Sequence, residues 1–221
     1  MNADLPILLL PGTLCDAALW GRLTRPALAC GPEVIRGRSL VDAAAQILED
    51  APPRFELLGF SLGAILAFEL LRQAPARVAR LTLISANPHA PSAVQLAAWE
   101  SQEERVRAEA FAQVARELAA LAGRHAPEVL QMALRVGPDA FLEHLHLLRS
   151  RPDSRPTLAK YGGPLTLLAG QGDAVTPVHL AEEMWRLAPQ AQLRVVPEAG
   201  HYLPLDAPGA VDEALRELVH A

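Results

Sequence analysis

The sequence is poor in several residue types that define whole classes of protein. Its 221 residues include two cysteines, Cys15 and Cys30, a single lysine and 5% aromatic residues. Two cysteines cannot make a disulfide framework, and their spacing fits no zinc motif. This cysteine content is typical of a protein kept in a reducing, intracellular compartment.

The sequence also lacks long apolar runs and long runs of one charge. The apolar stretch over residues 6–11 is far too short to span a membrane, and it lacks the basic segment and cleavage site of a signal peptide. The net charge of −5 is spread along the chain and gives neither a nucleic-acid footprint nor a basic membrane face. We therefore expect a cytoplasmic protein that binds neither nucleic acid nor membrane.

Hydrophobic residues are abundant and fall into alternating strand and helix patterns. They make up 51% of the chain, and 221 residues suit one compact domain, 1–221, with room for an inserted subdomain. The alternation predicts an α/β fold: a three-layer structure with a mostly parallel sheet of about six strands. The expected strands cover residues 7–10, 33–36, 55–58, 81–85, 165–169 and 193–196.

The pattern of hydrophobic residues changes between residues 87 and 160, where no strand pattern is present. A helix is expected over residues 93–122, closed by Gly123, and two more over 127–136 and 138–148, each with Pro near its first turn. We interpret the segment from about 88 to 158 as a compact helical lid inserted over the carboxyl edge of the sheet. Ordinary core helices would give the same periodicity, so this alternative stays open.

The most informative motif is Gly59-Phe60-Ser61-Leu62-Gly63. It joins an expected buried strand to an expected helix, which places the Ser61 hydroxyl on a tight turn above the end of the sheet. Glycine on either side lets the helix leave close to its strand. We predict a positive φ for Ser61, a strained conformation that a functional site can maintain. The alternative interpretation is a glycine-rich helix start with Ser61 as N-cap.

Two further polar residues follow later strands in the order that a serine nucleophile requires. Asp173 lies in the turn after the strand over 165–169, and His201 lies in the loop after the last strand. Parallel strands end at one edge, so Ser61, Asp173 and His201 should converge there. Asp153 and Asp206 are rivals for the acidic role.

On these residues the chain resembles the α/β-hydrolases, especially their small, single-domain, esterase-like members. The similarity extends over nearly the whole chain, through residues 10–13, 59–63, 170–173 and 200–204. It implies that Ser61 is the nucleophile, His201 the general base and Asp173 the residue that orients His201. It also implies an oxyanion hole made by the backbone N–H groups of Thr13 and Leu62.

Some residues depart from the family pattern or have a competing interpretation. Pro11 stands before Gly12 where the family usually has histidine. His144 and His146 are two apart on one expected helix and point to different faces, so we expect no metal site. Cys15 lies near the expected oxyanion loop, and a small buried hydrophobe is favoured over a functional role.

The sequence thus predicts a serine hydrolase that cleaves a carboxylic ester through an acyl-enzyme, without metal or organic cofactor. The apolar lid helices indicate a small-molecule substrate with an apolar group. Thioesterase, lactonase, C–C hydrolase and perhydrolase activities would use the same three residues and stay open. A non-catalytic, ligand-binding protein of the same fold is the alternative from another class.

Overall fold

A computed structural model describes residues 5–24 and 29–217 of the chain. Six strands form one sheet in the order β2-β1-β3-β4-β5-β6, and all five neighbouring pairs are parallel. The strands are β1 Ile7–Leu10, β2 Ala29–Cys30, β3 Phe55–Phe60, β4 Val78–Ile84, β5 Leu165–Gly170 and β6 Gln192–Val196. The predicted α/β fold with about six strands is confirmed.

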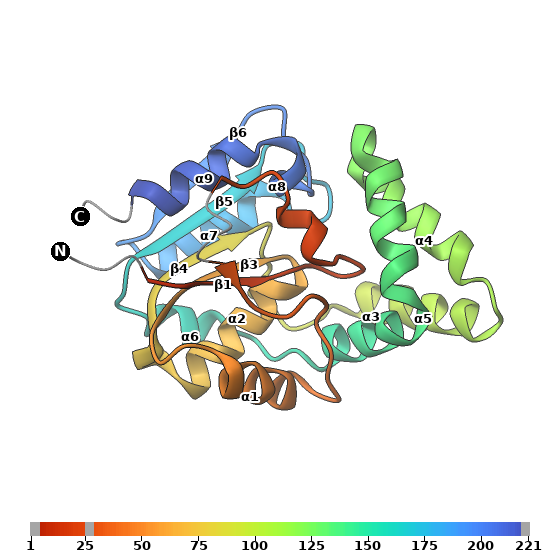
Figure 1. Ribbon diagram of the computed structural model, residues 1–221, viewed down its shortest axis with the longest axis horizontal. Helices are drawn as coiled ribbons and strands as arrows, with labels where there is room; N and C mark the ends of the chain where they lie inside the picture. The colour runs from red at the N-terminus through yellow and green to blue at the C-terminus, as the bar shows by residue number, and fades with distance from the viewer. Residues whose placement is uncertain (1–4, 25–28, 218–221) are drawn as a thin grey trace.

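Helices cover both faces of this sheet. The buried hydrophobic clusters place α1, α2 and α7 on one face of the strands and η1, α8 and α9 on the other, and Figure 1 shows α1 and α2 on the side opposite α9. The helices outside the segment between β4 and β5 are η1 Ala17–Trp20, α1 Leu40–Asp50, α2 Leu62–Gln73, η3 Pro75–Arg77, α7 Val178–Leu187, α8 Leu203–Asp206 and α9 Pro208–Glu217. This three-layer arrangement leaves the strand ends as the accessible edges of the sheet.

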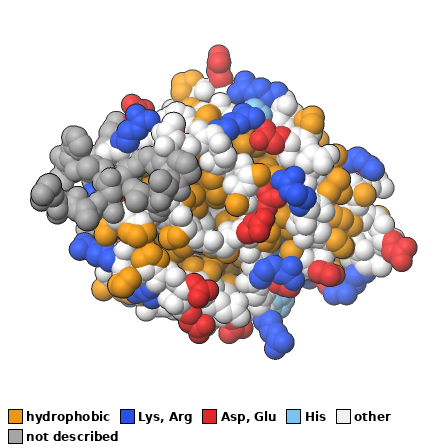
Figure 2. Space-filling model, viewed as in Figure 1, with side chains coloured by type: hydrophobic (Ala, Val, Ile, Leu, Met, Phe, Trp, Pro, Cys, Tyr) orange, Lys and Arg blue, Asp and Glu red, His pale blue; other side chains and the backbone are white. Residues whose placement is uncertain are grey.

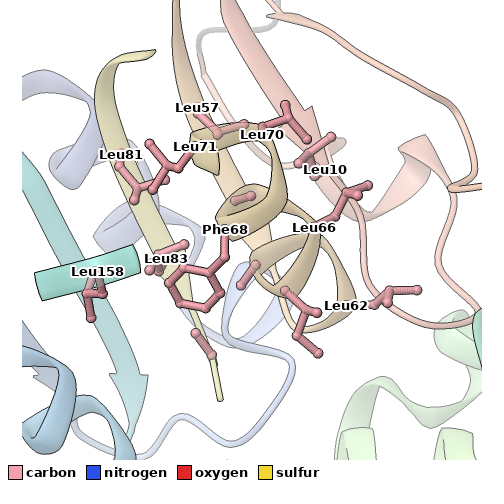
Figure 3. Close-up of a cluster of buried hydrophobic side chains, with 14 of the residues drawn as sticks. Leu10, Leu57, Leu62, Leu66, Phe68, Leu70, Leu71, Leu81, Leu83 and Leu158 are labelled. Carbon is pink, nitrogen blue, oxygen red and sulfur yellow. The ribbon is translucent and has the colours of Figure 1, made fainter. Parts of the chain in front are cut away.

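The core is densest where α2 crosses the central strands. Every residue of β3 is buried, and α2 buries ten of its twelve residues. Figure 3 shows Leu66, Phe68 and Leu70 of α2 directed among the leucines of β1, β3 and β4. Fully burying a side chain of this size contributes about 1.5–3 kcal/mol, so α2 is held firmly on the sheet.

The segment between β4 and β5 contains helices and no strand within the described residues. Its helices are α3 Ala93–Arg107, α4 Phe111–Ala119, η4 Ala120–His125, α5 Ala126–Ser150 and α6 Arg155–Ala159. Figure 1 places α3, α4 and α5 together at one end of the sheet. The strands' carboxyl ends face this helical segment, because Ser61 at the end of β3 lines a cavity together with residues of α3, α4 and α5.

Two of the element predictions were wrong in detail. The expected strand over 33–36 is irregular, and β1 pairs with Ala29–Cys30 instead. Ile35 is fully buried, but its carbonyl accepts a hydrogen bond from the side chain of His144 at 2.8 Å rather than from a strand. The expected single helix over 93–122 breaks at Glu109, whose φ is 63°.

The predicted pair of helices around Gly137 is present as one element with a kink. Gly137 has φ 82° and ψ 171° inside α5, and Pro138 follows it. A left-handed φ is accessible to glycine without steric cost, which explains the bend at this point. None of the helices within residues 5–24 and 29–217 has the length and apolar character that a membrane span requires.

Candidate active site

Ser61 occupies the turn between β3 and α2 that the sequence predicted. Its φ is 52° and its ψ is −110°, so the predicted positive φ is confirmed. Glycine is needed on both sides of this turn. A Cβ on Gly59 would lie 2.5 Å from the Gly63 carbonyl oxygen, and one on Gly63 would lie 2.0 Å from the Leu10 carbonyl oxygen. The close crossing of β1, β3 and α2 thus fixes the serine by its backbone.

The structure brings Ser61, His201 and Asp173 into one hydrogen-bonded chain. His201 Nε2 lies 3.1 Å from Ser61 Oγ, and His201 Nδ1 lies 2.9 Å from Asp173 Oδ2. Both the histidine and the aspartate are buried, with exposures of 7% and 4%. The ring of Phe60 packs 5.2 Å from the His201 ring and limits its rotation. An imidazole held between a carboxylate and a hydroxyl can take a proton from that hydroxyl.

Asp173 is surrounded by hydrogen-bond donors besides His201. Its Oδ1 accepts the backbone N–H groups of Val175 and Thr176, each at 2.8 Å, and its Oδ2 accepts the Thr176 hydroxyl at 2.6 Å. Burial alone would raise the pKa of Asp173, but the hydrogen bonds from His201 and Thr176 outweigh it and hold that pKa below its usual value. The carboxylate is therefore ionised and fixed in orientation.

The two rival aspartates have other partners. Asp153 accepts hydrogen bonds from Arg155, the shortest at 2.6 Å. Asp206 accepts the Gly200 N–H at 2.9 Å and lies 3.4 Å from Arg124. Neither carboxylate hydrogen-bonds to His201. Asp173 is thus the acidic partner of this histidine.

The loop after β1 lies against the serine turn. A Cβ on Gly12 would lie 2.7 Å from the Phe60 ring and 3.4 Å from Ser61 Cβ, so the backbone at Gly12 and Thr13 is close to the hydroxyl. Within the described residues, the Thr13 N–H donates no hydrogen bond. Leu62 begins α2, where a backbone N–H has no intrahelical acceptor. Neither amide has a backbone acceptor within the described residues.

His144 makes structural contacts beside this loop that the sequence pattern did not predict. His144 is fully buried in α5; its Nδ1 accepts the Leu14 N–H at 3.2 Å and its Nε2 donates to Ile35 O. Burial lowers the pKa of His144 to about 4, so the ring is neutral with its proton on Nε2. Leu14 has φ 57°, and this hydrogen bond helps to hold that strained residue.

Ser85 is a second residue that the sequence did not single out. It ends β4 with φ 49°, and its hydroxyl donates to the carbonyl oxygen of His201 at 3.0 Å. This bond joins the His201 loop to the sheet edge. The signal available in the sequence was only a serine after a buried strand, which many loops share.

Ser61 and His201 open onto a cavity of about 140 Å³ between the sheet edge and the helical segment. Most of its far wall is apolar and comes from α4, η4 and α5: Leu118 of α4, Leu121 of η4, and Phe141, Leu145 and Leu148 of α5. Its polar lining comprises Thr13, Ser61, Ser85, Asn87, Gln95, Gln102, Arg151, Thr176 and His201. Leu62 is not among the lining residues. Such a cavity suits a small molecule with an apolar part.

The remaining candidates do not join this site as reactive groups. Cys15 is fully buried, and burial raises the pKa of its thiol to about 12, which keeps it un-ionised. The part of the chain that the structure describes holds no group of three or more His, Cys, Asp or Glu side chains placed to bind a metal. Figure 2 shows charges of both signs interspersed over the visible face rather than collected in one patch.

Comparisons with known proteins agree with this geometry. A family model described as the thioesterase domain matches residues 31–218. Pimeloyl-[acyl-carrier protein] methyl ester esterase from Vibrio parahaemolyticus is 27% identical over 182 residues, which is 75% of this chain and 70% of the relative.

Two solved structures show the same arrangement over almost the whole chain. A thermophilic esterase from Thermogutta terrifontis, solved with malate bound, is 26% identical with a TM-score of 0.88, covering 99% of this chain and 90% of its own. A hydrolase from Pseudomonas aeruginosa has a TM-score of 0.84 at 21% identity, covering 100% and 92%, and shows the shared fold. The chain therefore belongs to the thioesterase-domain family and is an α/β-hydrolase of the esterase type.

Proposed function

We propose that the protein hydrolyses a carboxylic ester through a covalent acyl-enzyme, with Ser61, His201 and Asp173 as its catalytic triad. The observation that carries the proposal is the hydrogen-bonded chain from Ser61 Oγ through His201 to Asp173, with contacts of 3.1 and 2.9 Å at the edge of a cavity. A serine hydroxyl is a weak nucleophile unless a base of this kind accepts its proton.

In the first half of the reaction, Ser61 Oγ attacks the acyl carbon while His201 Nε2 accepts the hydroxyl proton. The negative charge that develops on the carbonyl oxygen is stabilised by the Thr13 and Leu62 N–H groups, and one such donor is worth about 3 kcal/mol. The tetrahedral intermediate then breaks its bond to the alcohol oxygen, and His201 returns the proton to the leaving alcohol. Ser61 is left acylated.

In the second half, water takes the place of the alcohol. His201 accepts a proton from that water as its oxygen attacks the acyl carbon, and the acid leaves as Ser61 Oγ recovers the proton. Asp173 keeps the Nδ1 proton of His201 in place throughout and stabilises the imidazolium that forms in each half. The steps use no metal and no organic cofactor.

In this proposal the segment from about residue 88 to 158 is the lid, and its apolar wall receives the apolar part of the substrate. Leu118, Phe141 and Leu145 come from that segment and face the same cavity as Ser61. An apolar acyl chain also fits the relatives that are pimeloyl-[acyl-carrier protein] methyl ester esterases. We assign the enzyme to the cytoplasm, in keeping with two cysteines that are both free.

A thioester is the second candidate for the bond cleaved. The match over residues 31–218 to a thioesterase domain favours it, and the same triad would release a thiol in place of an alcohol. A matched panel of esters and thioesters, graded by acyl length, separates the two candidates by their kcat/KM values.

The test of the triad is the variant Ser61→Ala. We expect its turnover of p-nitrophenyl acyl esters to fall on the order of 10⁴-fold or more, because the nucleophile is removed while the binding surface stays. A fluorophosphonate probe should label the wild-type protein at Ser61 and leave the variant unlabelled. Full activity in Ser61→Ala would refute the assignment, and an unlabelled wild-type protein would favour the ligand-binding alternative.

A further inference from the structure

Arg151 is a buried cation in the wall of the cavity that holds Ser61. It follows α5 directly, is 5% exposed, and lines the same cavity as Ser61 and His201. Arginine is rarely buried without a partner, and its guanidinium keeps its charge at neutral pH. Among the described residues, Arg151 is the one arginine in the buried part of the protein.

Every contact of this guanidinium is with a neutral group. Its Nε donates to the carbonyl oxygen of His89 at 2.8 Å, and its Nη2 donates to Gln95 Oε1 at 3.0 Å. The guanidinium carbon lies 5.3 Å from the centre of the Trp99 ring. Nη1 forms no hydrogen bond with residues 5–24 or 29–217. It is nevertheless not one of the fully buried side-chain atoms that lack a partner. Nη1 therefore retains contact with solvent.

No carboxylate neutralises Arg151 within the described part of the chain. The nearest acidic residue in sequence, Asp153, is already bound to Arg155. Burial lowers the pKa of Arg151 to about 10, and no neighbouring anion offsets that effect. The charge is thus desolvated and has no anion beside it, and burying an unpaired charge lowers the stability of the folded protein.

Other arginines of the helical segment contrast with Arg151. Arg105 and Arg149 are more exposed, and each is bound to a glutamate. Both of these arginines join two helices, and each does so through a carboxylate on the neighbouring helix. A buried arginine without one, in the wall of the cavity of the proposed nucleophile, indicates that the anion comes from outside the chain.

We propose that the substrate carries an anionic group, a carboxylate or a group of similar charge, that binds Arg151 while its ester lies at Ser61. The inference rests on the proposed ester hydrolysis and names the substrate class: esters with a second, ionised end, such as half-esters of dicarboxylic acids. His89 O and Gln95 hold the guanidinium in place before the substrate enters, so little is lost in ordering it. The apolar wall formed by Leu118, Phe141 and Leu145 would then contact the chain between the two ends.

The competing interpretation is that Arg151 is only structural. Its bonds to His89 O and Gln95, with the stacking on Trp99, would then serve to join the end of α5 to α3 and to the loop after β4. Under that interpretation, replacing Arg151 would affect neutral and anionic substrates alike.

The experiment compares p-nitrophenyl esters that differ only in the charge of the far end. One series has a free ω-carboxylate on acyl chains of graded length, and the other has a methyl group at that end. A third arm places the carboxylate on the alcohol side, which distinguishes the two possible locations of the anion. We expect wild-type kcat/KM to favour one anionic series over the neutral one by about 10-fold or more.

The variant Arg151→Met should abolish that preference. It keeps an unbranched apolar stem, so we expect about a 10- to 100-fold loss on the preferred anionic ester and less than about a 3-fold change on its neutral counterpart. Arg151→Lys should restore part of the preference. The matched control Arg116→Met removes the same charge from an exposed position on α4 and should leave the preference intact. Equal losses on both series would overturn the proposal in favour of the structural role.

Binding to Ser61→Ala separates this inference from the proposed hydrolysis. Calorimetric titration of that variant with glutarate, adipate and pimelate should show saturable binding that the additional change Arg151→Met weakens at least 10-fold. If no ester is hydrolysed but this pattern holds, the ester hydrolysis fails and the anion site stands. If neutral esters are hydrolysed in a Ser61-dependent way and no dicarboxylate binds, the hydrolysis stands and the anion site is refuted.

Discussion

The sheet edge and the helical segment between β4 and β5 are built by different means. At the edge, β1, β3 and α2 approach so closely that a single Cβ on Gly63 would lie 2.0 Å from a carbonyl oxygen. In the helical segment, α3 buries only Val106 of its fifteen residues and is connected to its neighbours through arginine–glutamate pairs. One region is fixed by backbone contacts and the other by side chains.

The two regions also have different proposed roles, since the sheet edge provides the reactive groups and the helical segment provides the groups that select the substrate. The groups proposed for the chemistry lie on turns that end strands, where a rigid backbone fixes Ser61, Asp173 and His201 relative to one another. The groups proposed to select the substrate, including Phe141 within α5 and Arg151 directly after it, lie in the helical segment and not on the sheet. A scaffold of this kind can keep one reaction while its substrate changes.

The largest expected effect follows from replacing a glycine in the rigid region. Gly63→Ala would force Cβ into the backbone of Leu10, so we expect a loss of at least about 4 kcal/mol in the free energy of unfolding, or no folded protein at all. The control Gly209→Ala meets no atom within 4 Å and should leave stability unchanged or raise it by up to about 1 kcal/mol. Urea unfolding followed by circular dichroism measures both. Equal tolerance of the two alanines would remove the contrast between the regions.

The rigid region is also the part that the sequence describes well. The turn at Ser61 with its positive φ follows from a local sequence pattern, and the convergence of residues 61, 173 and 201 follows from the rule that parallel strands end at one edge. Each of the three residues is marked by the pattern of its own short stretch of chain, and the rule then relates stretches that are far apart.

What the sequence could not indicate depends on contacts over long distances. The hydrogen bond between Leu14 and His144 joins residues 130 positions apart, and the buried state of Arg151 depends on how α3 packs beside it. No glycine or proline occurs at the break at Glu109, so the sequence does not indicate it. The turn there lets α4 lie against α5 and bury Val114 and Ala115. These features depend on how the helices pack against one another, and the local patterns of a single sequence do not specify that packing.

His144 connects the two regions, and its titration gives the intermediate effect. Burial lowers its folded pKa to about 4, below the usual 6.5, so the unfolded chain binds this proton first as the pH falls. The stabilisation from neutral His144 is therefore complete above about pH 6.5 and declines progressively towards pH 4. Between pH 7 and 5 the loss is about 2 kcal/mol.

The measurement compares urea unfolding of the wild-type protein and His144→Gln at pH 7, 6 and 5. Glutamine can still accept from Leu14 N–H and donate to Ile35 O, but it does not titrate. The free energy of unfolding of the variant should therefore fall less over this range, by about 2 kcal/mol. Parallel curves for the two proteins would show that His144 is protonated in the folded state at pH 5 and that the link between α5 and the Leu14 loop does not depend on its neutral form.

The smallest expected effect comes from an ion pair that joins two helices of the helical segment. Arg105 of α3 donates two hydrogen bonds of 2.7 Å to Glu117 of α4, and this bidentate contact holds the pKa of Glu117 below its usual value. Both side chains are open to solvent, where water and salt screen the attraction and ordering two long side chains offsets much of it. We expect Glu117→Gln to lower Tm by only about 1–2 °C.

Salt and a matched variant make this small effect informative. The Tm difference between wild type and Glu117→Gln should vanish in about 1 M NaCl, where the Debye length is roughly 3 Å. Glu100→Gln removes an exposed glutamate of α3 that forms no ion pair with another described residue, and it should leave Tm unchanged. If Glu117→Gln instead lowers Tm as much as a core substitution does, the two helices depend on this pair, and the helical segment is no more tolerant of exchange than the sheet edge.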